Sequence, residues 1–296
     1  MKAMILAAGF GTRLRPYSQL RPKPLFPILN QPLIGLTIAR LRANGFTEIL
    51  VNTHYLAPAI VNFLRHEKDV FIQREPRILG TGGGLGRALS WFGSEPVLVI
   101  NGDIVCDLNL QSLYDLHCAS GAAASLVVHD LPRFNNVWVD GPGNIAGLGE
   151  DQVTGPRTAL AFTGIHIITP EILRGIAANT FSSIIDWYRR LISRGIPIKA
   201  IQVDGHYWTD IGTLADYLAL HREILTRKIT IPGLPVPDTP FWIGDGCMTP
   251  DDVTFIDWVC LGPGVRIGKR AVLEQVVAWP GCTIPDGARC RETLMV

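Results

Sequence analysis

The sequence lacks several patterns that would place it in a common class. Its 296 residues contain no run of five like charges and carry a net charge of +1, which disfavours a nucleic acid or a membrane surface as partner. No apolar stretch approaches the roughly 20 residues that span a bilayer, and no signal-peptide pattern precedes the first strand-like run. The six cysteines include no C-x-x-C pair, and a chain of this length needs no disulfide framework. We therefore expect a globular, cytoplasmic protein with reduced cysteines.

Two common nucleotide-binding patterns are also missing. Gly9 and Gly11 could begin a G-x-G-x-x-G dinucleotide fingerprint, but Leu14 stands where the third glycine is needed. The first loop holds no Walker A motif, and Lys269, which follows a glycine, precedes Arg270 rather than Ser or Thr. The loop after the first strand therefore fits neither class.

That loop nevertheless has the composition of a phosphate site. The string L-A-A-G-F-G-T-R-L-R-P occupies residues 6–16, and P-K-P follows at 22–24. Glycines allow backbone N–H groups to approach phosphate oxygens, and oriented amides add partial positive charge. Arg13 can offer a planar fork of donors and Lys23 a compact point charge. The sequence thus predicts a polyphosphate site, rather than a plain structural turn, within its first 25 residues.

The first hundred residues alternate strand-like and helix-like segments, as in a doubly wound parallel sheet with ligands at the carboxyl ends of its strands. A small antiparallel insertion or lid is expected at 133–157. The expected strands are Lys2–Leu6, Glu48–Asn52, Val70–Gln73, Val97–Ile100, Ala122–Val128, Ala161–Ile168 and Ile198–Val203. The expected helices are Pro32–Asn44, Ala57–Leu64, Gly84–Trp91, Ser183–Ser193 and Leu214–Thr226.

A different organisation is expected after a proline-rich linker at 229–242, which divides a domain at 1–228 from a tail at 243–296. Written in hexads from Ile243, the tail carries a small or β-branched residue at each fifth position through Thr283, and the register does not slip. This period predicts a triangular parallel β-coil, with ordinary hairpins as the alternative. The tail resembles the short left-handed parallel β-helix of hexapeptide-repeat proteins, although Pro285 and Arg289 depart from the pattern.

A carboxylate follows the strand at 97–100. Asp103 ends the string V-I-N-G-D, and Mg²⁺ prefers one or two carboxylates together with phosphate oxygens. The alternative is that Asp103 serves only a turn or a helix cap. Asp107 is a weaker metal candidate, because it could cap a helix that begins near Leu108.

The loop at 6–24 resembles the signature of sugar-1-phosphate nucleotidyltransferases, and the resemblance extends over residues 1–226. The wording is similar to N-acetylmuramate 1-phosphate uridylyltransferases and to mannose 1-phosphate guanylyltransferases. The resemblance implies a Rossmann-like, GT-A-like body that joins a nucleoside triphosphate to a sugar 1-phosphate and releases pyrophosphate. It implies Arg13 and Lys23 as catalytic charges, and Mg²⁺ on Asp103 and on Asp210 of the string Y-W-T-D-I-G-T, with Thr213 as a helix N-cap. The nucleotide contacts that it implies are Leu6, Ala7, Ala8, Gly9, Gly11, Thr12, Glu75, Gly80, Thr81 and Gly102.

The nucleobase is addressed by Glu75 and the Gly80 amide in this resemblance. A carboxylate can accept from uracil N3–H or from the guanine edge, whereas cytosine offers an acceptor at its ring nitrogen. UTP or GTP is therefore favoured. The alternatives are that Glu75 is a surface residue and that the following glycines form only a helix entrance.

The sugar site departs from the family pattern. Many relatives have Glu-Lys after the insertion, whereas this chain has Gly-Glu-Asp at 149–151, so the lysine expected on the sugar phosphate is missing. Glu150, Thr163 and Gly164 remain candidates for sugar contacts, with plain loop and strand roles as the alternative. The sequence does not specify the sugar.

A non-catalytic, NDP-sugar-binding regulatory subunit is the rival hypothesis, because a similar body with a β-coil also describes such proteins. Retention of all four charged residues favours the enzyme. An acyltransferase in the tail is disfavoured, because no histidine follows His221. Since β-coils leave an open end that neighbours often cover, we expect a homo-oligomer.

Overall fold

The computed structural model describes residues 1–151 and 154–296. Over these residues the contacts divide the chain into two compact units. Unit 1 contains Met1–Gly9, Leu41–Gly102 and Leu108–His206. Unit 2 contains Phe10–Arg40, Asp103–Asp107 and Tyr207–Val296. This division differs from the boundaries expected from the sequence, because unit 2 combines part of the N-terminal sequence with the tail.

The centre of unit 1 is a mixed, mostly parallel sheet, as predicted. Its strand order is β10-β9-β11-β6-β1-β4-β5, and β8 pairs with both β11 and β12. β1 lies parallel between β4 and β6, and β5 continues the parallel part, so the predicted βαβ rhythm is confirmed. The strands are β1 (Lys2–Leu6), β4 (Glu48–Thr53), β5 (Val70–Arg74), β6 (Val97–Asn101), β8 (Ala124–His129), β9 (Val137–Val139), β10 (Ile145–Leu148), β11 (Thr158–Ile168) and β12 (Ile198–Gln202).

Helices of unit 1 pack on this sheet through a continuous apolar core. α4 (Gly80–Phe92) and α6 (Ile184–Ser193) contribute buried side chains to the cluster that also contains Met4 and Val99 from the strands. The other helices are α2 (Leu33–Ala43), which runs from unit 2 into unit 1, α3 (Ala57–Leu64), α5 (Leu110–Ser120) and the 3-10 helix η3 (Pro170–Gly175). Within the described residues, no helix is both long and apolar enough to cross a membrane.

Two predictions for unit 1 need correction. α4 begins at Gly80, so the glycine run lies inside its first turn rather than before it. α5 begins at Leu110 rather than near Leu108, and its N-cap is Asn109, whose side chain accepts from Ser112 N. Asp107 therefore does not cap this helix. The predicted antiparallel insertion is confirmed, because β9 pairs antiparallel with β10 and with β11.

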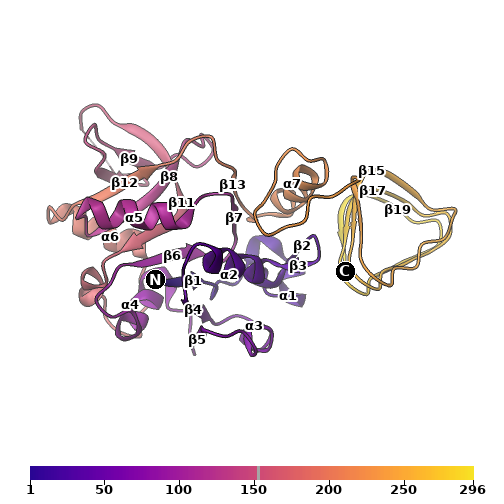
Figure 1. The fold of residues 1–296 in the computed structure, drawn as a ribbon, viewed down its shortest axis with the longest axis horizontal. Coiled ribbons are helices and arrows are strands. Elements are labelled where there is room, and N and C mark those ends of the chain that lie inside the picture. Colours follow the sequence, from indigo (N-terminus) through magenta and orange to yellow (C-terminus); the bar gives the residue numbers. More distant parts are fainter. Residues whose placement is uncertain (152–153) are drawn as a thin grey trace. The chain divides into compact units, whose positions relative to one another are not determined.

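Unit 2 begins with short elements and ends in a parallel β-coil. Figure 1 shows the chain from β14 onward winding in stacked, roughly triangular turns. Phe241 pairs with Val259 and Thr254 with Val272, so each of these turns holds three hexads. The early elements are η1 (Thr12–Leu14), α1 (Tyr17–Leu20), η2 (Lys23–Leu25), β2 (Pro27–Ile28), β3 (Gln31–Pro32) and β7 (Ile104–Cys106). The later ones are β13 (Trp208–Asp210), α7 (Leu214–Leu225), β14 (Phe241–Ile243), β15 (Thr254–Leu261), β16 (Arg266–Ile267), β17 (Val272–Ala278), β18 (Thr283–Ile284) and β19 (Arg289–Met295).

The coil departs from the predicted register by one residue. Opposite Asp257 and Trp258 of β15, β17 has only Gln275, because Ile256 pairs with Glu274 and Val259 with Val276. The Gln275 amide donates to the Asp257 carboxylate at 2.6 Å across this corner. The inward positions are therefore Val259, Val265 and Ala271, and then Val276 and Cys282. The expectation that the register holds through Thr283 is wrong, since Thr283 is exposed and Cys282 is buried.

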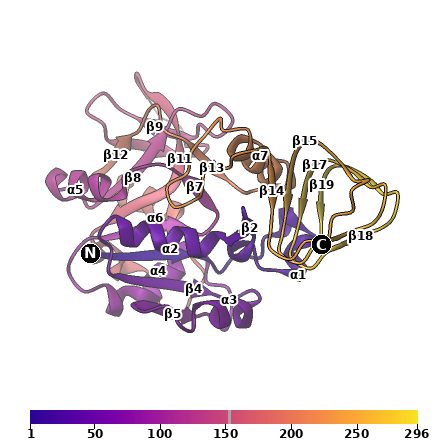
Figure 2. The same cartoon turned by 45° about the vertical axis from the view of Figure 1, so that its right-hand side comes forward.

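The outer face of the coil belongs to a second core. Trp258, Cys260, Val277, Trp279 and Leu294 are buried with side chains of α7 and of the early part of unit 2. Figure 2 shows α7 beside β15, β17 and β19. The expected linker at 229–242 also contributes to this core, through Ile231 and Leu234. The coil therefore shares a hydrophobic core with the segment that carries Arg13 and Lys23.

The corrected register can be tested with neighbouring substitutions. We expect Cys282→Lys to lower the free energy of unfolding by about 3 kcal/mol or more, because an ammonium group would be desolvated inside the coil without a partner. Thr283→Lys, at the exposed neighbouring position, should change it by less than about 0.5 kcal/mol. Denaturant titration of both variants measures the difference. Equal losses, or a larger loss for Thr283→Lys, would contradict the register described here.

Candidate active site

Asp103 and Asp210 are brought together by a short backbone ladder in unit 2. β7 and β13 are antiparallel, with Ile104 opposite Asp210, and Ile211 N donates to Asp103 O at 3.0 Å. The ladder fixes the two acidic residues at the same end of the paired strands. Thr213 then starts α7 with the predicted N-cap, in a capping box with Asp216.

Two cations lie against these carboxylates. Lys23 Nζ is 2.5 Å from Asp103 Oδ2, and the Lys23 side chain is only 11% exposed. Arg13 NH2 is 3.7 Å from Asp210 Oδ2, and its side chain is 61% exposed. The structure thus gathers the four charged residues that the sequence singled out, all within unit 2.

The electrostatics of this cluster favour an additional cation. Burial raises the pKa of Asp210, and the neighbouring Asp103 carboxylate raises it further, whereas Lys23 and Arg13 act in the opposite direction. Among the described residues, no group of three or more His, Cys, Asp and Glu side chains forms a complete metal site. Two carboxylates that repel each other nevertheless suit Mg²⁺, which can take its remaining ligands from water and phosphate.

The segment at 12–28, which we call the clamp segment, is shaped by a glycine at its start. Gly11 has φ +62°, and a Cβ there would lie 3.3 Å from Ser18 Cβ and 3.6 Å from Lys23 Cβ. Ser18 was not predicted from the sequence. Its hydroxyl is buried and has no hydrogen-bond partner among the described residues. Gly212 leaves similar room, because a Cβ there would lie 2.9 Å from both the Arg13 guanidinium and the Asp210 carboxylate.

In unit 1, Glu75 is part of a buried polar network and is not a surface residue. Asn52 Nδ2 donates to Glu75 Oε1 at 2.8 Å, and Leu79 N donates to Glu75 Oε2 at 3.1 Å. Asn52 Oδ1 also accepts from Ala7 N at 2.8 Å, at the carboxyl end of β1. Asn52 was missed by the sequence reasoning, although its place at the end of a predicted strand was a usable signal. The network joins the first loop to the predicted base-contacting carboxylate.

The glycines that follow are required by close packing within unit 1. A Cβ on Gly80 would lie 2.6 Å from Ser182 O, and a Cβ on Gly84 would lie 3.0 Å from Glu75 Oε1. Thr81 Oγ1 accepts from Ile184 N at 3.0 Å, so this predicted nucleotide contact already supports the start of α6.

The remaining residues predicted near the phosphates divide between the units. Leu6, Ala7, Ala8, Gly9 and Gly102 are in unit 1, whereas Gly11 and Thr12 are in unit 2. Gly102 N donates to Leu6 O at 2.9 Å, and a Cβ on Gly102 would lie 2.9 Å from the same oxygen. Gly102 is thus a close-packing glycine between β1 and β6. Ala7 and Ala8 are buried, and Thr12 starts η1.

The predicted sugar contacts have different environments. Thr163 is fully buried, and its hydroxyl donates to Val127 O at 2.8 Å. Gly164 has φ +74° where the β11–β8 register shifts, a backbone conformation that favours glycine. Glu150, by contrast, is exposed. Fold roles therefore account for Thr163 and Gly164, and only Glu150 presents its side chain to solvent.

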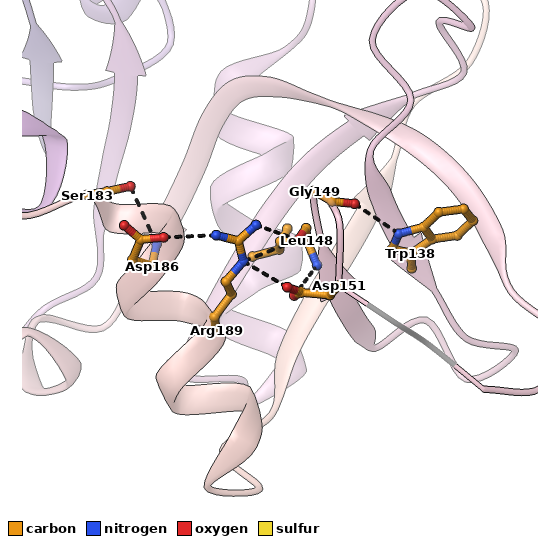
Figure 3. Close-up of polar contacts among 7 residues, drawn as sticks. All are labelled: Trp138, Leu148, Gly149, Asp151, Ser183, Asp186 and Arg189. Atoms are coloured by element: carbon orange, nitrogen blue, oxygen red, sulfur yellow. Dashed lines mark hydrogen bonds and ion pairs between the residues drawn. The ribbon is translucent and has the colours of Figure 1, made fainter.

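An arginine that was not predicted holds the turn that carries Glu150. Arg189 of α6 contacts Asp151 at 3.0 Å, Asp186 at 2.9 Å and the carbonyl of Leu148 at 2.8 Å (Figure 3). A Cβ on Gly149 would lie 2.5 Å from the guanidinium, so the glycine permits this approach. The turn at 149–151, where the lysine of the family pattern is missing, is thus contacted by an arginine from α6. Two carboxylates already neutralise that arginine.

Comparisons with known proteins agree with the resemblance drawn from the sequence. A UTP–glucose-1-phosphate uridylyltransferase of Synechocystis is 29% identical over 338 residues, which cover 100% of this chain and 87% of that protein. Mannose-1-phosphate guanylyltransferase 1 of Arabidopsis thaliana is 29% identical over 314 residues, covering 99% and 83%. N-acetylmuramate alpha-1-phosphate uridylyltransferase of Neisseria meningitidis is 34% identical over 226 residues, covering 72% and 94%.

A solved structure supports the fold. HddC from Yersinia pseudotuberculosis, complexed with GMP-PN, has a TM-score of 0.62 at 24% identity and is covered over 97% of its chain, against 74% of this one. The family model for nucleotidyl transferases matches residues 2–227, which include all four charged residues of the site. On this match and on the relatives above, the chain belongs to the nucleotidyl transferase family.

Proposed function

We propose that the protein joins a nucleoside triphosphate to a sugar 1-phosphate and releases pyrophosphate. The observation that carries the proposal is the cluster of Arg13, Lys23, Asp103 and Asp210, in which two cations accompany two neighbouring carboxylates. Phosphoryl chemistry needs positioning and neutralisation of charge more than a covalent nucleophile, and this cluster supplies both.

Each charged residue has a separate task in this proposal. Asp103 and Asp210 hold Mg²⁺, which would supply Lewis-acid neutralisation of phosphate charge. Arg13 and Lys23 contact the phosphates that leave as pyrophosphate. Lys23 must therefore exchange its 2.5 Å contact with Asp103 for a phosphate oxygen when the triphosphate binds. The buried Ser18 hydroxyl beside Gly11 is an additional group in the same segment without a partner among the described residues.

No general base is required. A sugar 1-phosphate is already largely ionised near pH 7, and one of its oxygens can attack the α-phosphorus directly. The new bond joins this oxygen to the α-phosphorus, and the bond to the pyrophosphate oxygen breaks. The absence of a proton transfer is consistent with a site composed of two acids and two permanent or near-permanent cations.

Glu75 favours UTP or GTP as the triphosphate. Its two oxygens accept from Asn52 and Leu79, and a carboxylate oxygen can accept more than one hydrogen bond. An oriented, buried carboxylate can thus still accept from an N–H group of uracil or guanine. Cytosine, whose ring nitrogen is an acceptor, would face it unfavourably.

Two further proposals concern the sugar site and the β-coil. Arg189 holds the turn at 148–151, and Glu150 is the residue there whose exposed carboxylate would contact sugar hydroxyls. The β-coil is proposed to be left-handed, by its resemblance to hexapeptide-repeat proteins, and its open end is proposed to meet a second copy.

The proposed function is tested by a matrix of pyrophosphate-release assays. UTP, GTP, dTTP, CTP and ATP are each combined with hexose, hexosamine, muramate and heptose 1-phosphates in the presence of magnesium. We expect turnover with UTP or GTP and a single class of sugar. Tight NDP-sugar binding without pyrophosphate release from any pair would instead favour the regulatory-subunit hypothesis.

Lys23→Ala should lower turnover about a hundredfold and at least tenfold. A cation positioned against the negative charge that develops on the phosphates contributes about 3 kcal/mol to transition-state stabilisation. Pyrophosphate release under saturating substrates measures the effect, with Lys269→Ala, on an exposed turn of the coil, as control. Near-normal turnover of Lys23→Ala would refute its assigned role.

Gly9→Ala tests whether a glycine is needed at this position for triphosphate binding rather than for folding. An added Cβ would meet no atom within 4 Å, and Gly9 does not have a positive φ. We expect an unchanged Tm but about a tenfold higher KM for the triphosphate, because the Cβ would occupy space that backbone amides need to reach phosphate. Gly141→Ala, which is equally unobstructed, is the control for Tm and KM. A normal KM in Gly9→Ala would remove the reason for a glycine at this position.

Asp210→Asn should stabilise the ligand-free protein while abolishing most turnover. The fold raises the pKa of Asp210, so the ionised carboxylate destabilises the native state once the pH exceeds the unfolded pKa. The variant should therefore have a higher Tm than wild type at pH 7, and the difference should shrink as the pH falls through the raised native-state pKa and vanish below the unfolded pKa. Thermal scans over pH, with the exposed Asp238→Asn as control, measure it. A lower Tm for Asp210→Asn at pH 7 would contradict the electrostatic account.

A further inference from the structure

Trp279, directly after β17 of the coil, makes an unusual set of contacts for a residue so distant in sequence from the proposed site. It is only 4% exposed and lies in the core that the coil shares with the rest of unit 2. No motif marked this residue in the sequence, where it stands at the first position of its hexad.

The indole ring contacts the clamp segment on several sides. The Phe26 ring lies edge-on with centroids 4.8 Å apart, and the Tyr17 ring lies edge-on at 6.3 Å. The Arg21 guanidinium carbon lies 4.7 Å from the indole centroid, which is within cation–π range. These contacts flank Lys23 on both sides in the sequence and begin four residues after Arg13.

A hydrogen-bond relay reinforces the ring contacts. Trp279 Nε1 donates to the Tyr217 hydroxyl of α7 at 3.2 Å, and that hydroxyl donates to Pro27 O at 2.5 Å. The Tyr217 ring also packs edge-on against Phe26 at 5.6 Å. The relay is buried, so its members have no water to replace a lost partner. The coil, α7 and the end of the clamp segment are thus linked by directional contacts as well as apolar packing.

Arg21 depends on this arrangement for its environment. Burial lowers the pKa of its guanidinium, and among the described residues it forms no ion pair with a carboxylate. The indole face compensates part of the lost hydration. Removing the indole would therefore release Arg21 as well as open space beside Phe26. Arg21 lies between Arg13 and Lys23 in the sequence, and Phe26 lies three residues after Lys23, so both changes fall within the clamp segment.

We propose that Trp279 is a positioning residue of the active site, which holds the clamp segment so that Arg13 and Lys23 meet the phosphates. The proposal rests on the function proposed above and adds a role for the coil within the catalytic unit. It does not make Trp279 a catalytic residue, because it acts only through Arg21, Phe26 and Tyr217.

Trp258 provides a matched control for this role. It is a tryptophan of the same coil, it is 2% exposed, and it lies in the same apolar core. Its indole nitrogen has no hydrogen-bond partner among the described residues, and no ring contact joins it to the clamp segment there. Trp258→Leu therefore removes a comparable buried surface without disturbing the contacts described above.

The experiment compares Trp279→Leu, Trp279→Phe and Trp258→Leu in the full chain. Pyrophosphate release gives kcat and KM, thermal unfolding gives Tm, and hydrogen–deuterium exchange reports peptides covering residues 12–28. We expect Trp279→Leu to lose about tenfold to a hundredfold in kcat, since small misplacements of distant groups have effects of this size. Trp279→Phe, which keeps a ring beside Arg21 and Phe26, should recover most of the loss, and Trp258→Leu should keep kcat within about twofold despite a similar fall in Tm.

Two results would overturn the proposal: wild-type kcat in Trp279→Leu, or an equal loss of kcat in Trp258→Leu. The exchange measurement separates this proposal from the proposed function, because it needs no turnover. Faster exchange at 12–28 in Trp279→Leu alone supports the positioning role even if wild type releases no pyrophosphate, in which case only the proposed function fails. Unchanged exchange in Trp279→Leu contradicts the positioning role whatever the activity.

Discussion

The site depends on holding two carboxylates side by side against their mutual repulsion. Backbone pairing between β7 and β13 fixes Asp103 and Asp210 at one end of a ladder, where burial adds to the unfavourable interaction. Lys23 and Arg13 offset part of it from the clamp segment. The two cations reduce the repulsion enough for the cluster to fold. Binding of an additional cation with its phosphate ligands remains favourable, because it reduces the repulsion further.

The C-terminal coil is packed against the segment that carries the cations of the site. Its outer face is buried with α7 and the clamp segment in one core, so the coil forms part of the packing that surrounds the proposed phosphate site in unit 2. Gly11 sets the start of the clamp segment through its positive φ, and Trp279 contacts the middle and the end. Precise placement of long, charged side chains requires such support, because each loses considerable freedom when fixed.

The sequence predicted what is encoded locally and missed what depends on tertiary pairing. Short sequence motifs identify the strand ends, the glycine loops and the charged residues of the site. The parallel sheet is predicted by the alternation of strand-like and helix-like segments. Asn52 and Arg189 were missed, because their roles lie in bonds to residues distant in sequence, although the strand-end position of Asn52 was a usable signal. The predicted register of the coil was wrong because β17 has one residue fewer than β15 at a corner, and the sequence does not reveal this. Val276 and Val277 are both apolar, so either could occupy the inward position. The shift places Cys282, rather than Thr283, inside the coil.

The central claim is that the four charged residues of unit 2 bind a magnesium triphosphate. A crystal structure of the protein with magnesium and the triphosphate that supports turnover tests it most directly. The account predicts that one metal ion contacts both Asp103 and Asp210, and that Lys23 leaves Asp103 for a phosphate oxygen while Arg13 contacts the same phosphates. A triphosphate bound away from all four groups, with the Lys23–Asp103 pair intact, would contradict it.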